Sequence, residues 1–142
     1  MQVNSIDSNT SFGTKVYAAK DAYNALQNTP RNAKKKIFQH IEALKNNGAD
    51  DILLLQYRKT NLNNNVIVAD IYVNNPDKNE YTVPSGDWLA QEFIVDPHKS
   101  GGRQSYINIK RLYNKLLEHI KYFNTQANKE ASDSYLKTFI EL

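Results

Sequence analysis

The chain of 142 residues carries 18 Lys plus Arg against 15 Asp plus Glu, a formal net charge of +3, which excludes a histone-like polycation and an acidic tail protein. It contains no cysteine, which excludes a disulfide scaffold, a thiolate nucleophile and a cysteine-ligated zinc site. A chain of this length forms one domain with its own core, which we expect over residues 14–142. The first residues show no periodicity and few apolar groups, so we expect a flexible tail over residues 1–13.

The first regular pattern after the tail predicts a helix hairpin. Apolar residues recur at steps of three and four from Val16 to Leu26, which is typical of one helix face. Thr29 followed by Pro30 favours the start of a second helix, with the threonine hydroxyl as its cap. Gly48 can end this helix in the left-handed backbone region. The second helix is expected to bury four apolar side chains, Ala33, Ile37, Ile41 and Leu44.

The middle of the chain changes to a period of two and is rich in β-forming residues. Three strands are expected in this region, over residues 52–59, 66–73 and 80–83. The short, Asn-rich connections between them predict antiparallel pairing. Residues 88–95 form a fourth strand or, in part, a helical turn. Asp50 and Asp51, which precede the first of these strands, are expected to be solvated turn residues.

The last part of the chain returns to the helical period. Apolar residues from Tyr106 to Phe123 fall on one stripe at about 100° per residue, which predicts a helix. The pattern resumes from Ala131 to Leu142 and predicts a further helix or a continuation of the previous one. The whole order predicts an α+β domain with an N-terminal helix hairpin and an antiparallel meander of three or four strands. The C-terminal helix or helices are expected to pack on one sheet face, leaving the other face partly polar.

Charge is segregated along the chain, with a net +4 over residues 31–49, −5 over residues 50–97 and +5 over residues 98–123. Basic helices can follow a phosphate backbone while tyrosines stack on bases. The candidate nucleic-acid ligands on the second helix are Arg31, Lys34, Lys35 and Lys36. These four residues span about 200° of the helix, so the alternative is that they are solvated or complement the acidic strands.

A second candidate site is the loop before the helix over residues 106–123. It carries two adjacent glycines between basic residues, and a helix N-terminus offers unpaired N–H groups to an anion. The candidate anion ligands are Lys99, Gly101, Gly102, Arg103 and Ser105. The alternative is a flexible connector in which Ser105 caps the helix.

The order of helix hairpin, meander and the stretch His98-Lys99-Ser100-Gly101-Gly102-Arg103 resembles the pyrophosphate-binding region of the GCN5-related acetyltransferases, over residues 14–123 at most. The resemblance implies acyl transfer with an anionic cofactor, coenzyme A, at this loop. The family pattern is Arg/Gln-x-x-Gly-x-Gly/Ala, from which this stretch departs. The sequence also predicts no strand before the first helix, which the family has.

Three further features bear on function. Trp88, the only tryptophan, is either a core residue or an aromatic anchor for a partner, because tryptophan offers a large contact area. The three histidines, His40, His98 and His119, are too widely spaced for a metal motif, so we predict no metal and no tightly bound cofactor. No apolar run approaches the roughly 20 residues that cross a bilayer.

These features together favour a non-enzymatic binding or protein-interaction module, whose partner is an unknown protein or a second copy of the chain. The alternatives are nucleic-acid binding through the basic helices and acyl- or phosphoryl-type transfer at the 98–105 loop. No catalytic residue is predicted. The first residues lack the basic and apolar regions of a secretory signal, so we expect a cytoplasmic protein. Specialised export through the N-terminal tail is the alternative.

Overall fold

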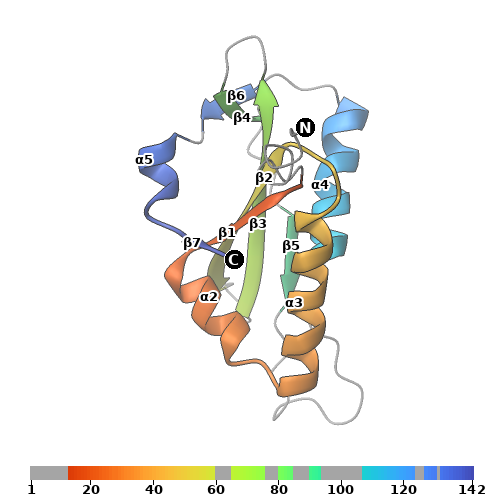
Figure 1. The fold of residues 1–142 in the computed structure, drawn as a ribbon, viewed down its shortest axis with the longest axis vertical. Helices are drawn as coiled ribbons and strands as arrows, with labels where there is room; N and C mark the ends of the chain where they lie inside the picture. Colours follow the sequence, from red (N-terminus) through yellow and green to blue (C-terminus); the bar gives the residue numbers. More distant parts are fainter. Residues whose placement is uncertain are drawn as a thin grey trace, which may run out of the picture.

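The computed structural model describes residues 13–59, 65–75, 80–84, 90–93, 107–123, 127–130 and 132–142. Their elements in chain order are β1 (Lys15–Ala18), α2 (Lys20–Gln27), α3 (Arg31–Lys45), β2 (Asp51–Lys59), β3 (Asn65–Asn75), β4 (Glu80–Pro84), β5 (Ala90–Phe93), α4 (Ile109–Phe123), β6 (Ala127–Glu130), α5 (Asp133–Leu136) and β7 (Ile140–Glu141). Figure 1 shows a central sheet with α3 and α4 side by side and α5 well apart from them. The predicted α+β class, with N-terminal helices, a strand meander and a C-terminal helix, is confirmed.

One segment predicted as helix is a strand. Residues Lys15–Ala18 form β1, and α2 begins only at Lys20. β1 runs parallel to β2, with Val16 beside Leu53, so the sheet is mixed rather than purely antiparallel. The apolar residues of β1 and α2 together happen to match the spacing of one helix face, although they belong to two different elements. A strand of four residues is too short for its own period to be distinguished from the helix that follows.

The two N-terminal helices are joined as predicted, but Thr29 does not cap the second. Its Oγ1 donates to the carbonyl oxygen of Leu26 at 2.7 Å and so closes the end of α2. Pro30 occupies the position before α3, which has no side-chain cap. Gly48 has a φ of +80°, the left-handed conformation expected after this helix. The buried stripe of α3 is the predicted one: Ala33, Ile37, Ile41 and Leu44.

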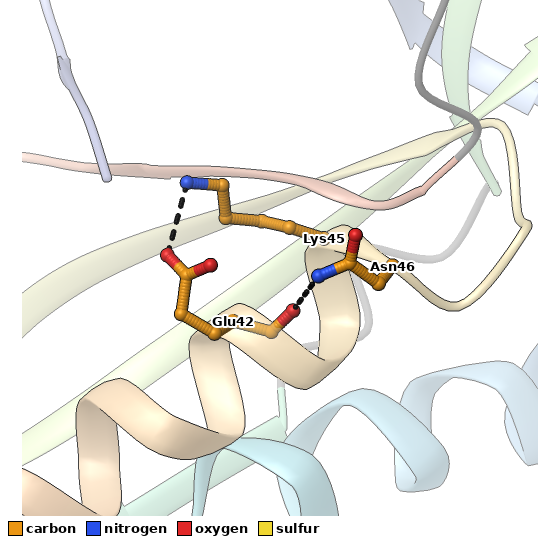
Figure 2. A network of polar contacts seen from close by, with 3 residues as sticks. All are labelled: Glu42, Lys45 and Asn46. Carbon is orange, nitrogen blue, oxygen red and sulfur yellow. Dashed lines mark hydrogen bonds and ion pairs between the residues drawn. The ribbon is translucent and has the colours of Figure 1, made fainter. Parts of the chain in front are cut away.

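The C-terminal end of α3 is held by contacts within its last turn (Figure 2). Lys45 Nζ lies 3.2 Å from Glu42 Oε1, and Asn46 Nδ2 donates to the carbonyl oxygen of Glu42 at 2.8 Å. A cation in the last turn also interacts favourably with the helix dipole. The charge of Lys45 is therefore balanced by a neighbour on its own helix.

The sheet has the order β6-β4-β3-β2-β1-β7, and β5 also pairs with β3. β4 pairs with residues 73–75 of β3 and β5 with residues 66–69, both antiparallel. These two strands therefore follow one another along the same edge of β3. The predicted fourth strand is confirmed over Ala90–Phe93, whereas Trp88 lies outside the described residues.

The two faces of the sheet bury separate cores. Leu53 and Leu55 of β2 pack with α2, α3 and α4, as predicted for helices on one face. Ile52 and Leu54 point to the opposite face, because side chains alternate along a strand. There they meet Leu136 of α5.

The C-terminal segment thus differs from the predicted helix on the common face. α5 has only four residues and lies on the opposite face, and β7 follows it and pairs antiparallel with β1. The physical reason is that β1, which the sequence did not reveal, leaves a strand edge open for pairing. The second face is therefore less polar than expected.

Candidate functional site

The helix predicted from residue 106 begins at Ile109 and is capped by Asn108. The Oδ1 of Asn108 accepts a hydrogen bond from the N–H of Arg111 at 3.0 Å, and its carbonyl oxygen accepts from the N–H of Leu112 at 3.1 Å. Ser105, the cap expected from the sequence, lies outside the described residues. Ile109, Leu112 and Tyr113 are buried, so the helix places its polar side away from the sheet.

The basic side chains of α3 face solvent and not the acidic strands. Arg31, Lys35 and Lys36 are exposed, while the apolar stripe of α3 covers the sheet. Lys34 is half-buried, and its Nζ donates to Gln27 Oε1 of α2 at 3.4 Å. The charges of Arg31, Lys35 and Lys36 are therefore accessible to a ligand.

An open groove of about 340 Å³ lies between α3 and α4. Its lining residues are His40 of α3 together with Asn108, Lys110, Arg111, Asn114, Lys115 and Glu118. We call these residues and the adjacent Lys36 the α3–α4 groove. Three cationic side chains and one carboxylate line it, so its local charge is positive. The positive end of the α4 dipole adds to this potential.

The imidazole of His40 on α3 interacts electrostatically with lysine side chains of both helices. Burial lowers the pKa of its imidazole, and the charges of Lys110 on α4 and Lys36 on α3 lower the pKa further. Its Nδ1 is buried and has no hydrogen-bond partner among the described residues. Two ammonium groups from different helices therefore disfavour the charged form of this imidazole.

Of the four basic residues predicted to bind nucleic acid, the structure brings only Lys36 to the groove. Arg31, Lys34 and Lys35 lie between roughly 100° and 160° around the helix axis from it. Lys110 and His40 were not predicted. The signal for α4 was the four-residue spacing of Lys110, Asn114 and Glu118 on the polar side of the helix, whereas no local signal marked His40.

The remaining predicted sites stay predictions. The anion-binding candidates Lys99, Gly101, Gly102, Arg103 and Ser105, like Trp88, lie outside the described residues. β1 precedes α2, so the strand that the acetyltransferase resemblance requires before its first helix is present. The loop that would hold coenzyme A is not among the residues that the structure describes.

A second polar cluster is buried where β1, β2 and α4 meet. Asp51, expected to be solvated, is only 5 % exposed. Thr14 Oγ1 donates to its Oδ1 at 2.5 Å, and the Tyr113 hydroxyl donates to its Oδ2 at 2.7 Å. Asn47 Nδ2 donates in turn to Thr14 Oγ1 at 2.8 Å. Each carboxylate oxygen thus has a protein donor, which fits a structural clamp better than a reactive acid.

Burial raises the pKa of Tyr113 to about 12, and the hydrogen bond to Asp51 and the charge of Asp51 act in the same direction. Hydrogen bonds with Thr14 and Asn47 act in the opposite direction. In the unfolded chain this phenol ionises near its ordinary pKa of about 10. Between these values the unfolded state loses a proton that the folded state keeps, so the stability falls as the pH rises from about 10 to about 12.

We expect this alkaline loss of stability to be smaller in Tyr113→Phe than in the parent protein. Urea unfolding at about pH 8 and about pH 11 measures it for both proteins. Part of the loss should remain in the variant, because burial also raises the pKa of Tyr72. An equal alkaline loss in both proteins would contradict the assignment to Tyr113.

Among the residues that the structure describes, no helix is long and apolar enough to cross a membrane. Within the same residues, no group of three or more histidine, aspartate or glutamate side chains is placed to hold a metal ion. Comparison with protein-family models, with curated proteins and with solved structures found no match to this chain.

Proposed function

We propose that this protein binds nucleic acid, without catalysing a reaction, by holding the phosphate backbone in the α3–α4 groove. The observation that carries the proposal is that Lys36 and Lys110, from segments far apart in the sequence, converge on His40 beside one open groove. Together with Arg111 and Lys115, which line the groove, these two lysines outnumber the one carboxylate, Glu118, and make this surface positive. Such a surface attracts a polyanion whatever its sequence.

The chemistry of the described surface supports a charged ligand over an apolar protein partner. Among the residues whose side-chain exposure the structure describes, Tyr135 is the one large apolar side chain that is exposed, at 37 %. A stable protein interface needs a buried apolar centre with aromatic or arginine anchors. The groove offers no aromatic anchor apart from His40 and is lined by Arg111, two ammonium groups and the side-chain amides of Asn108 and Asn114, which can donate to phosphate oxygens.

The test is a fluorescence-anisotropy titration with two labelled DNAs, a thymidine oligomer of about 20 nucleotides and a mixed-sequence duplex of the same length. We expect binding that weakens steeply as salt rises. Lys36→Ala combined with Lys110→Ala should weaken binding roughly tenfold at low salt and reduce the salt slope by about two, because each lysine contacts one phosphate.

The matched control combines Lys20→Ala with Lys137→Ala. It removes the same two charges from exposed positions on α2 and just after α5, outside the groove. The control should bind DNA nearly as well as the parent protein. The proposal fails if neither DNA binds at low salt, or if the control weakens binding as much as the groove variant. Binding of polyglutamate but not DNA would favour an acidic protein partner instead.

A further inference from the structure

We infer that one phosphate group of the bound nucleic acid occupies the groove beside His40 and that the imidazole takes up a proton when this phosphate binds. The inference rests on the proposed function and adds a specific subsite and a pH dependence to it. It starts from the geometry of the groove: His40 is the residue of α3 that lines it, opposite five residues of α4 and the N-cap Asn108.

The unliganded imidazole lacks a stabilising partner. Its Nδ1 is buried without a hydrogen bond to the described residues, an arrangement that is costly when nothing compensates. Protonation alone does not relieve this cost, because Lys36 and Lys110 both repel a second positive charge. A phosphate in the groove supplies the missing negative charge through space, without contacting the buried Nδ1.

The other charged groups of the groove act in the same direction, with one exception. Arg111 and Lys115 add positive charge, which attracts phosphate and disfavours a charged imidazole in its absence. Glu118 alone opposes them, since its carboxylate favours the imidazolium and repels phosphate. The net positive groove therefore disfavours the protonated form of His40 until an anion enters.

The sign of the pH dependence follows from this arrangement. The pKa of His40 is lowered in the free protein, first by burial and then by Lys110 and Lys36. A bound phosphate offsets the two lysines and raises that pKa, so the complex holds a proton that the free protein lacks. Affinity must then increase as the pH falls through the range between the two values.

The experiment repeats the DNA titration from about pH 8 to about pH 5.5 at constant ionic strength with the thymidine oligomer, whose bases and phosphodiesters do not titrate in this range. Binding is expected to tighten about fivefold towards the lower pH, because the complex takes up a proton that the free protein lacks. The double variant His98→Gln with His119→Gln should keep this dependence, because His40 is its only histidine. His40→Gln should bind with little pH dependence.

The outcomes separate the two proposals. Absence of DNA binding at every pH overturns the proposed function, and the inference with it. Binding that tightens equally in His40→Gln overturns the inference alone. If His40→Gln does not fold, proton NMR of the double variant still decides the question, because its single imidazole can be titrated with and without the oligomer. An unchanged pKa would then overturn the inference.

Discussion

Replacing Gly13 with alanine is expected to lower the free energy of unfolding by about 3 kcal/mol or more, a larger effect than most single substitutions cause. A Cβ at this position would lie 1.8 Å from the carbonyl oxygen of Lys45 and 3.0 Å from the backbone nitrogen of Asn46. Both atoms belong to the backbone at the end of α3. The clash therefore cannot be relieved by rotating a side chain.

The backbone next to Gly13 is also tied to that helix end. The N–H of Thr14 donates to the carbonyl oxygen of Leu44 at 3.0 Å and to Asn47 Oδ1 at 3.1 Å. Moving Gly13 away from Lys45 breaks these bonds and disturbs the clamp around Asp51. Urea unfolding monitored by circular dichroism measures the loss.

Gly48→Ala is the matched control, because nothing lies within 4 Å of a Cβ built at Gly48. Its cost comes only from the positive φ and amounts to about 1–2 kcal/mol. If Gly13→Ala costs no more than this control, the close approach of Gly13 to the end of α3 is wrong. The comparison thus separates a steric clash from a backbone preference.

Removing the Asp51 carboxylate is the second change with a large expected effect. Asp51→Ala leaves the hydroxyls of Thr14 and Tyr113 without their acceptors, and Asp51 is nearly fully buried. Hydrogen bonds to a charged group contribute about 1.5–3 kcal/mol each, so we expect a loss of about 3 kcal/mol in unfolding free energy. Asp51→Asn keeps one acceptor oxygen and should lose less.

A double-mutant cycle distinguishes the hydrogen bond from a general packing effect. Asp51→Ala and Tyr113→Phe should show a coupling of about 1–2 kcal/mol, because each removes the same bond. The exposed neighbour Asp50, replaced by alanine, should lose less than about 1 kcal/mol. Additive effects of the two clamp variants would show that Tyr113 does not depend on Asp51.

Much of the fold could be predicted because its main elements carry their own periods. The buried stripe of α3 and the β-forming apolar runs of β2 and β3 are local patterns, and each produces the element expected from it. β1 could not be predicted, because four residues contain too little of a period and its partners are non-local. The same missing strand explains why the position of the C-terminal segment was not predicted.

The candidate site could also be predicted only in part. Segment charge indicated that the helices are basic, and the structure confirms that Arg31, Lys35 and Lys36 are exposed. That Lys36 and Lys110 meet at His40 depends on how two helices pack, which no local spacing encodes. Asp51 is buried for a comparable reason, since its donors come from Thr14 and Tyr113, far away along the chain.

The pairing of β7 with β1 brings together two segments that lie far apart along the chain, although very few strand residues form the pairing. Only two residue pairs join these strands, beside one further bond from the Leu142 N–H to the Val16 carbonyl oxygen at 2.8 Å. The closure joins residues roughly three times farther apart than the β1–β2 pairing does, which costs about 1 kcal/mol more in chain entropy. Leu136 and Phe139, packed on the second face of the sheet, offset that entropy through apolar burial. The last strand is therefore kept in register as much by the side chains that precede it as by its own backbone.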